Sequence, residues 1–123
     1  MNWPQVKGFL GLAVRARQAV FGEDGCRKLI RAGGCALLVL DARASQAARD
    51  RYEGLCARAG VPLLRLSENQ LFEATGRPGI AMALNRGSIA DELLRLTAED
   101  TAGQAPAETN QDIKAPIGGA CVE

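Results

Sequence analysis

Histidine is absent from this sequence, and aromatic residues make up only 4% of its 123 positions. The four cysteines (Cys26, Cys35, Cys56 and Cys121) form no C-x-x-C pair. Because zinc sites are usually built from closely spaced cysteine and histidine ligands, we expect no metal site. The same absences argue against nucleophilic catalysis by a Ser–His or Cys–His pair. The scarcity of aromatic rings disfavours a nucleic-acid surface built on base stacking.

Signals for export and for membrane insertion are also missing. Met1–Gln18 carries charges and lacks the continuous apolar core of a signal peptide. No apolar run approaches the roughly 20 residues that are needed to span a bilayer. Since reduced thiols are the simplest state of the cysteines, the sequence predicts a cytoplasmic protein. The length suits one domain, and the chain has neither a P-loop nor a dinucleotide-binding fingerprint, so we expect no enzyme.

The net charge of +1 conceals an asymmetry along the chain. Residues 1–97 hold 14 of the 15 Lys and Arg residues and 9 of the 14 acids, a net charge of +5. Residues 98–123 hold one Lys and five acids, a net charge of −4, in a segment rich in Ala, Thr, Gln, Gly and Pro. Such a segment buries too little apolar surface to order itself. The sequence therefore predicts a basic domain over 1–97 and an acidic, disordered tail over 98–123.

Apolar periodicity predicts helices that alternate with short strands. Ala36–Leu40 is a continuous apolar run, as expected of a central strand that is covered on both faces. Helices are expected over 4–17, 23–32, 45–59 and from Ser88, with strands over 63–66 and 80–84 and a short extended piece over 18–21. This order indicates a three-layer α/β/α sandwich around a small mixed sheet of about four strands.

Two of the expected helices carry more specific signals. Ser45 is a candidate N-cap for a helix whose inward face comprises Ala48, Tyr52, Leu55, Cys56 and Ala59. Ser67 and Gln70 have the spacing of a capping box for a further short helix. Both signals predict where the chain enters a helix.

Four segments, taken in register, resemble a known family. They are Phe9–Asp24, Cys26–Gly33, Leu37–Ser45 and Gly60–Leu66. Together they resemble the small bacterial ribosomal-protein-like branch of the ribosomal L-seven-Ae/L-thirty-e kink-turn RNA-binding superfamily, over roughly Val6 to Leu96. The resemblance implies an α/β/α sandwich with no cofactor and no catalytic activity. It also implies structured RNA as the partner, such as ribosomal or another non-coding RNA, and an association with the ribosome.

The resemblance places the first RNA-binding element at the start of the second helix. Gly22 and Lys28 match the family's glycine and lysine, and unpaired backbone amides at a helix start attract phosphate. The candidate RNA-binding residues here are Gly22, Glu23, Asp24, Arg27, Lys28 and Arg31. Kink-turn binders carry Asn and Glu where this chain has Asp24 and Gly25. A plain N-cap glycine, acids that stabilise the helix dipole and a solvated basic face remain open as alternatives.

The second RNA-binding element implied by the resemblance is a loop before the last strand. It comprises Gly76 and the candidate contacts Arg77, Pro78, Gly79 and Ile80. Kink-turn binders have small apolar residues in this loop, so an Arg-Pro-Gly loop favours a different RNA feature, and an ordinary tight turn is the alternative. Arg43, at the end of the central strand, is a further candidate RNA contact.

Two functions are therefore compatible with the sequence. The first is a non-catalytic RNA-binding protein that is associated with the ribosome or recognises a kink-turn-like or internal loop. The second is a protein-interaction module on the same fold that has lost specific RNA recognition. Gly25, the Arg-Pro-Gly loop and the acidic tail favour the second, and the tail could also compete with RNA for the basic face.

Overall fold

The computed structural model describes residues 2–102, with side chains as far as Asp100. Within that range the chain forms five helices and five strands. In chain order these are α1 (Trp3–Arg15), β1 (Ala19–Phe21), α2 (Glu23–Arg31), β2 (Cys35–Asp41), α3 (Gln46–Ala59), β3 (Leu63–Leu66), α4 (Gln70–Thr75), β4 (Ala81–Asn85), α5 (Ser88–Leu96) and β5 (Thr101–Ala102). No helix in this part of the chain has the length and apolar character needed to cross a bilayer.

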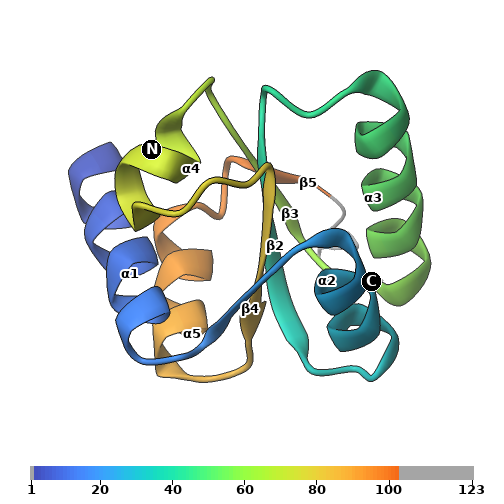
Figure 1. Ribbon diagram of the computed structural model, residues 1–123. Helices are drawn as coiled ribbons and strands as arrows, with labels where there is room; N and C mark the ends of the chain where they lie inside the picture. Colours follow the sequence, from blue (N-terminus) through green and yellow to red (C-terminus); the bar gives the residue numbers. More distant parts are fainter. Residues whose placement is uncertain (1, 103–123) are drawn as a thin grey trace.

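The five strands form one mixed sheet with helices on both faces (Figure 1). The strand order is β1-β4-β2-β3-β5, and only the β2–β3 pair is parallel. Helices α1, α4 and α5 cover one face, and α2 and α3 cover the other. The predicted three-layer α/β/α sandwich is thus confirmed.

The central strand β2 supplies both halves of the hydrophobic core. All seven of its residues are buried. Because successive side chains of a strand point to opposite faces, Leu37 and Val39 pack under α1, α4 and α5, while Leu38 and Leu40 pack under α2 and α3. The prediction of a strand covered on both faces is confirmed, and β2 pairs with β3 on one side and with β4 on the other.

Helix α3 follows the predicted pattern except at its end. Ser45 Oγ accepts a hydrogen bond from the Ala48 amide at 3.1 Å, as expected of an N-cap. Ala59, which was predicted to face inward, is exposed. Gly60 turns the chain in the left-handed region with φ +71°, and the buried Val61 takes the place next to the core.

The start of α4 differs from the predicted capping box. Gln70 Oε1 accepts a hydrogen bond from the Ser67 amide at 2.8 Å, which is one half of the box. The helix begins only at Gln70, because Asn69 adopts a left-handed conformation with φ +68°. The Ser67 side chain therefore does not cap this helix.

The described chain also continues beyond the predicted domain end at residue 97. Thr101 and Ala102 pair with Leu64 and Leu63 as the antiparallel strand β5. This pairing covers an edge of β3, whose amides and carbonyls would otherwise be unpaired. The remainder of the predicted disordered tail lies outside the described residues.

Candidate nucleic-acid interface

The first candidate element is the junction between β1 and α2. Gly22 has φ +89°, a backbone conformation that favours glycine, and a Cβ built on it meets no atom within 4 Å. The first intrahelical hydrogen bond runs from the Cys26 amide to the Gly22 carbonyl at 3.0 Å. The amides of the preceding turn have no intrahelical acceptor, so they can bind an anion.

Glu23 does more than interact with the dipole of α2, because its ion pairs connect α2 to α3. Its carboxylate accepts two hydrogen bonds from Arg51 of α3, at 3.0 and 3.1 Å, and one from Arg27 at 2.7 Å. The Arg51 contact, and then that of Arg27, holds the pKa of Glu23 below its usual value, against the opposing effect of burial. Glu23 is therefore an ionised carboxylate with two arginine partners.

Close packing of α2 on β1 explains the glycine at position 25. A Cβ at Gly25 would lie 2.6 Å from Cγ1 of Val20, far inside normal contact distance. Any side chain at position 25 would therefore overlap with Val20 unless Val20 or the helix moved. Its neighbours Asp24 and Lys28 are both exposed.

The second candidate element folds onto the end of β1. The guanidinium carbon of Arg77 lies 4.7 Å from the centre of the Phe21 ring, a cation–π contact. A Cβ at Gly79 would be 3.5 Å from the same ring. Since Phe21 directly precedes Gly22, the two elements predicted from distant parts of the sequence lie against each other.

Arg43 links a third segment to this loop. Its Nη2 donates to the Gly79 carbonyl at 3.0 Å, and its Nε donates to Oδ1 of Asp41 at 3.2 Å. The Arg43 side chain is 35% exposed, so part of its guanidinium faces solvent. Arg43 therefore positions the loop, a role that the sequence did not indicate, and its contact with RNA stays a prediction.

Asp41 is the residue of this region that the sequence analysis missed. Its side chain is fully buried at the end of β2. It accepts hydrogen bonds from the Arg43 amide at 2.9 Å and from the amides of Asn69 and Leu71, both at 3.4 Å. Asp41 thus connects the loop after β2 to the segment that leads into α4. The sequence signal that could have indicated Asp41 is a single acidic residue at the end of a continuous apolar run.

The sheet register brings these pieces to one end of the molecule. Phe21 pairs with Met82, and Leu40 pairs with Ala81, so the end of β1, the start of β4 and the end of β2 are neighbours. Lys28 lies one helical turn after Asp24 in α2. Pro78 and Ile80 belong to the loop between α4 and β4. Most of the predicted contacts therefore lie around the end of the sheet at which β1 and β2 end and β4 begins.

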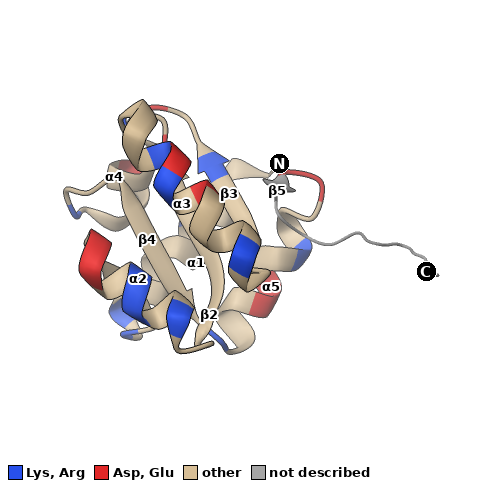
Figure 2. Cartoon of the chain, turned by 90° about the vertical axis from the view of Figure 1, so that its right-hand side faces the viewer, with Lys and Arg blue, Asp and Glu red and all other residues tan. Residues whose placement is uncertain are grey.

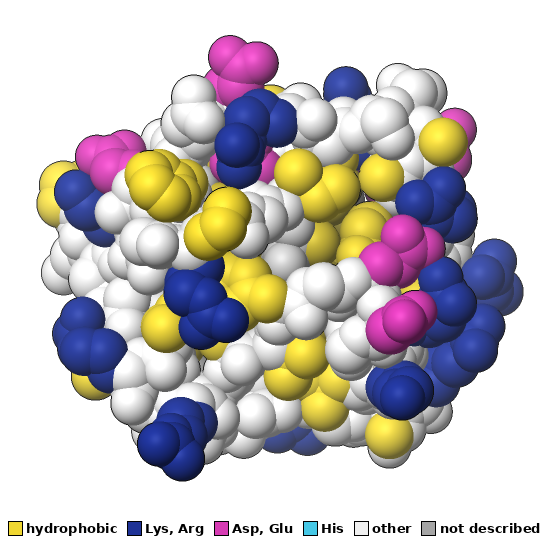
Figure 3. All heavy atoms as spheres, viewed as in Figure 1, with side chains coloured by type: hydrophobic (Ala, Val, Ile, Leu, Met, Phe, Trp, Pro, Cys, Tyr) yellow, Lys and Arg dark blue, Asp and Glu magenta, His cyan; other side chains and the backbone are white. Residues whose placement is uncertain are grey.

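Arg27 and Arg31 do not belong to that end. They face α3 and line a cleft with Arg51 and Arg58, which were not predicted as site residues. Figure 2 shows basic residues on both helices of this layer, and Figure 3 shows them gathered along the same edge of the molecule. Arg51 and Arg58 are seven residues apart in a helix, so they share a face, and this was the signal that could have found them.

Metal-binding clusters are not found in the described part of the chain. Among residues 2–102 no three His, Cys, Asp or Glu side chains lie close enough together to hold a metal ion. Cys26, Cys35 and Cys56 are buried free thiols. The fourth cysteine, Cys121, lies outside the described residues.

Comparisons with known proteins identify the fold. No protein-family model and no curated protein matches the sequence significantly. A Bacillus halodurans protein of unknown function superimposes with a TM-score of 0.71 and 23% identity, over 76% of this chain and 97% of that one. The Giardia lamblia 15.5kD RNA binding protein superimposes with a TM-score of 0.66 and 15% identity, over 80% and 90%. This chain therefore shares its fold with both proteins.

Proposed function

We propose that this protein is a non-catalytic RNA-binding protein that recognises a structured RNA, with ribosomal RNA as a candidate target. The observation that carries the proposal is that the two candidate elements meet through the contact of Arg77 with Phe21, and that Arg43 joins them by its hydrogen bond to the Gly79 carbonyl. The fold shared with an RNA-binding protein supports it. The cytoplasmic location expected from the sequence is part of the same proposal.

In this proposal the first turn of α2, Lys28 and the loop of Arg77 form a sheet-end interface, which binds a phosphate and an adjacent base. The unpaired amides after Gly22 donate hydrogen bonds to the phosphate oxygens, while Lys28 and Arg77 add positive charge. Asp24 accepts a hydrogen bond from a base edge, for example a guanine amine. Because position 25 has no side chain, the chain lacks one base contact of the kink-turn binders and reads a related but altered RNA feature.

The buried thiols support the part of the proposal that assigns no catalytic activity to the protein. Desolvation raises the pKa of Cys26 to about 11 and that of Cys56 to about 12. Both thiols are therefore protonated at neutral pH, and a protonated thiol is a poor nucleophile. Packing in the core under α2 and α3 explains why cysteines occupy these two positions.

The proposal is tested by titrating the protein with a kink-turn RNA and with a duplex of equal length, at two salt concentrations. The unaltered chain should prefer the kink-turn RNA. Replacing Lys28 and Arg77 together by Ala should weaken that binding by about tenfold or more, because two phosphate contacts are lost. Equal affinities of this variant and the unaltered chain would contradict the proposed interface.

A matched control removes the same charge from the other layer. Arg15 on α1 and Arg95 on α5 are exposed, and both helices lie on the face of the sheet opposite to α2. The double Ala variant at these positions should bind RNA like the unaltered chain. A similar loss in both double variants would mean that only net charge matters and that no defined site exists.

The second candidate function is a protein-interaction module. The observation that favours it is the exposure of two large hydrophobic side chains, Leu12 on α1 at 40% and Phe72 on α4 at 49%. This function predicts that neither RNA binds, even at low salt. That outcome would overturn the RNA-binding proposal.

A further inference from the structure

A groove runs between α2 and α3 on the outer face of their layer. Its first part is a cleft of about 220 Å³ that begins beside Glu23, the first residue of α2. Its second part, of about 240 Å³, shares Arg31, Leu55 and Arg58 with the first. We call this continuous feature the α2–α3 groove. Its lining includes Arg27 and Arg31 of α2 and Arg51, Tyr52, Leu55 and Arg58 of α3.

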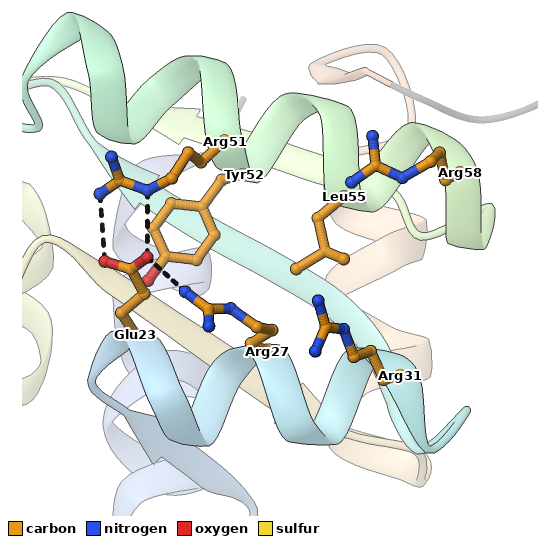
Figure 4. A pocket seen from close by; sticks show the side chains of 7 residues that line it. All are labelled: Glu23, Arg27, Arg31, Arg51, Tyr52, Leu55 and Arg58. Atoms are coloured by element: carbon orange, nitrogen blue, oxygen red, sulfur yellow. Dashed lines mark hydrogen bonds and ion pairs between the residues drawn. The ribbon is translucent and has the colours of Figure 1, made fainter.

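The charges of the α2–α3 groove are strongly unbalanced. Four arginines line it against a single acid, Glu23, which pairs with Arg27 and Arg51. Arg31 and Arg58 have no ion-pair partner among residues 2–100, and Figure 4 shows them on either side of Leu55. Like charges in one groove repel each other, so an anionic ligand would be stabilised there.

The floor of the groove adds a neutral donor. Tyr52 is only 3% exposed, and its hydroxyl has no hydrogen-bond partner within the described chain. Burial raises the pKa of Tyr52 to about 12, so the hydroxyl keeps its proton at neutral pH. A buried polar group is normally hydrogen-bonded. The groove therefore offers guanidinium and hydroxyl donors, which suit a ligand rich in acceptor oxygens.

We propose that the α2–α3 groove binds the sugar-phosphate backbone of the RNA strand that leaves the sheet-end interface. This inference rests on the proposed function, since the ligand is the same RNA. The groove starts at Glu23, directly after Gly22, so a strand whose phosphate sits on the first turn of α2 continues into it. Backbone contacts of this kind add affinity without reading sequence.

The spacing of the arginines along the groove suits a nucleic-acid backbone, which carries a negative charge at every nucleotide. Arg27 and Arg31 are one helical turn apart on α2, about 6 Å along its axis. Arg51 and Arg58 are two turns apart on α3, about 10.5 Å along its axis. Within residues 2–100, Arg31 on one wall and Arg58 on the other keep their guanidinium forks free for phosphates, which each accept paired hydrogen bonds. Arg27 and Arg51 add positive charge beside Glu23.

The test compares a kink-turn RNA that has a long flanking helix with one trimmed to the kink itself. Replacing Arg31 and Arg58 together by Ala should weaken binding of the long RNA by about tenfold and leave the trimmed RNA unaffected. The slope of log affinity against log salt should fall by nearly two for the long RNA, since each lost phosphate contact contributes about 0.9. The Arg15 and Arg95 double Ala variant is the matched control and should change neither quantity.

The possible outcomes separate this inference from the proposed function. If the Arg31 and Arg58 variant binds the long RNA with unchanged affinity and salt slope, the groove inference is overturned and the sheet-end interface stands. If the variant loses affinity for both RNAs equally, the two arginines belong to the primary interface, and the groove inference is again overturned. If the unaltered chain binds no RNA, the proposed function fails, and the groove inference fails with it.

Discussion

At the scale of single residues, the buried carboxylate of Asp41 determines how three segments meet. It accepts hydrogen bonds from Arg43, Asn69 and Leu71, and Arg43 in turn holds the Gly79 carbonyl. We predict that Asp41→Asn lowers the free energy of unfolding by about 2–3 kcal/mol, because the amide group turns a donor toward buried donors. Urea unfolding followed by circular dichroism measures this, and Asp50→Asn on the exposed side of α3 is the control. Equal midpoints for both variants would contradict this account.

The buried thiols give a second residue-scale prediction, on alkaline stability. Burial raises the pKa of Cys56 from its ordinary 9.0 to about 12. The folded state therefore holds this proton more tightly than the unfolded state does. The contribution of the protonated Cys56 thiol to the free energy of unfolding is complete below pH 9 and is lost between pH 9 and 12. We expect the urea midpoint to fall between pH 8 and pH 10.5. Cys56→Ala should reduce that fall, and an unchanged fall would show that other groups cause it.

At the scale of elements, the packing of α2 on β1 explains why position 25 is glycine. We predict that Gly25→Ala destabilises the fold by about 1 kcal/mol, although alanine favours helices, because its Cβ would overlap with Val20. In a double-mutant cycle with Val20→Ala, the two costs should not add, since the smaller side chain makes room. Chemical unfolding of the four proteins measures the coupling. Additive costs would mean that another contact excludes the side chain.

The elements also show which features the sequence could predict. The Ser45 cap and the apolar run of β2 depend on residues close in the chain, so local patterns were sufficient. The contact of Arg77 with Phe21 and the partners of Asp41 arise only when distant segments meet across the sheet. The α2–α3 groove likewise requires two helices to pack side by side. The sequence pattern therefore indicates a single basic face on α2, whereas Arg27 and Arg31 line the groove and Lys28 does not. The resemblance predicted which segments are candidates for the interface, and the packing of distant segments determines the contacts that their residues make.

At the scale of the whole molecule, the separation of charge along the chain predicts competition for the basic surfaces. Residues 103–123 carry Glu108, Asp112 and Glu123 against Lys114, a net charge of −2. We predict that removing these residues raises RNA affinity severalfold at low salt, with a smaller effect at high salt because screening weakens the competition. The truncation must follow Ala102, since removal of β5 would uncover the edge of β3. Binding titrations at two salt concentrations measure the effect.

A full-length variant separates charge from chain length in the same experiment. Replacing the three acids by Gln, Asn and Gln keeps the segment and removes its negative charge. If competition is electrostatic, this variant should gain as much RNA affinity as the truncated chain. A gain on truncation alone would mean that the segment blocks the surface by its bulk. Unchanged affinity in both would show that the acidic segment and the basic domain act independently, because neither its charge nor its presence then affects the surfaces that bind RNA.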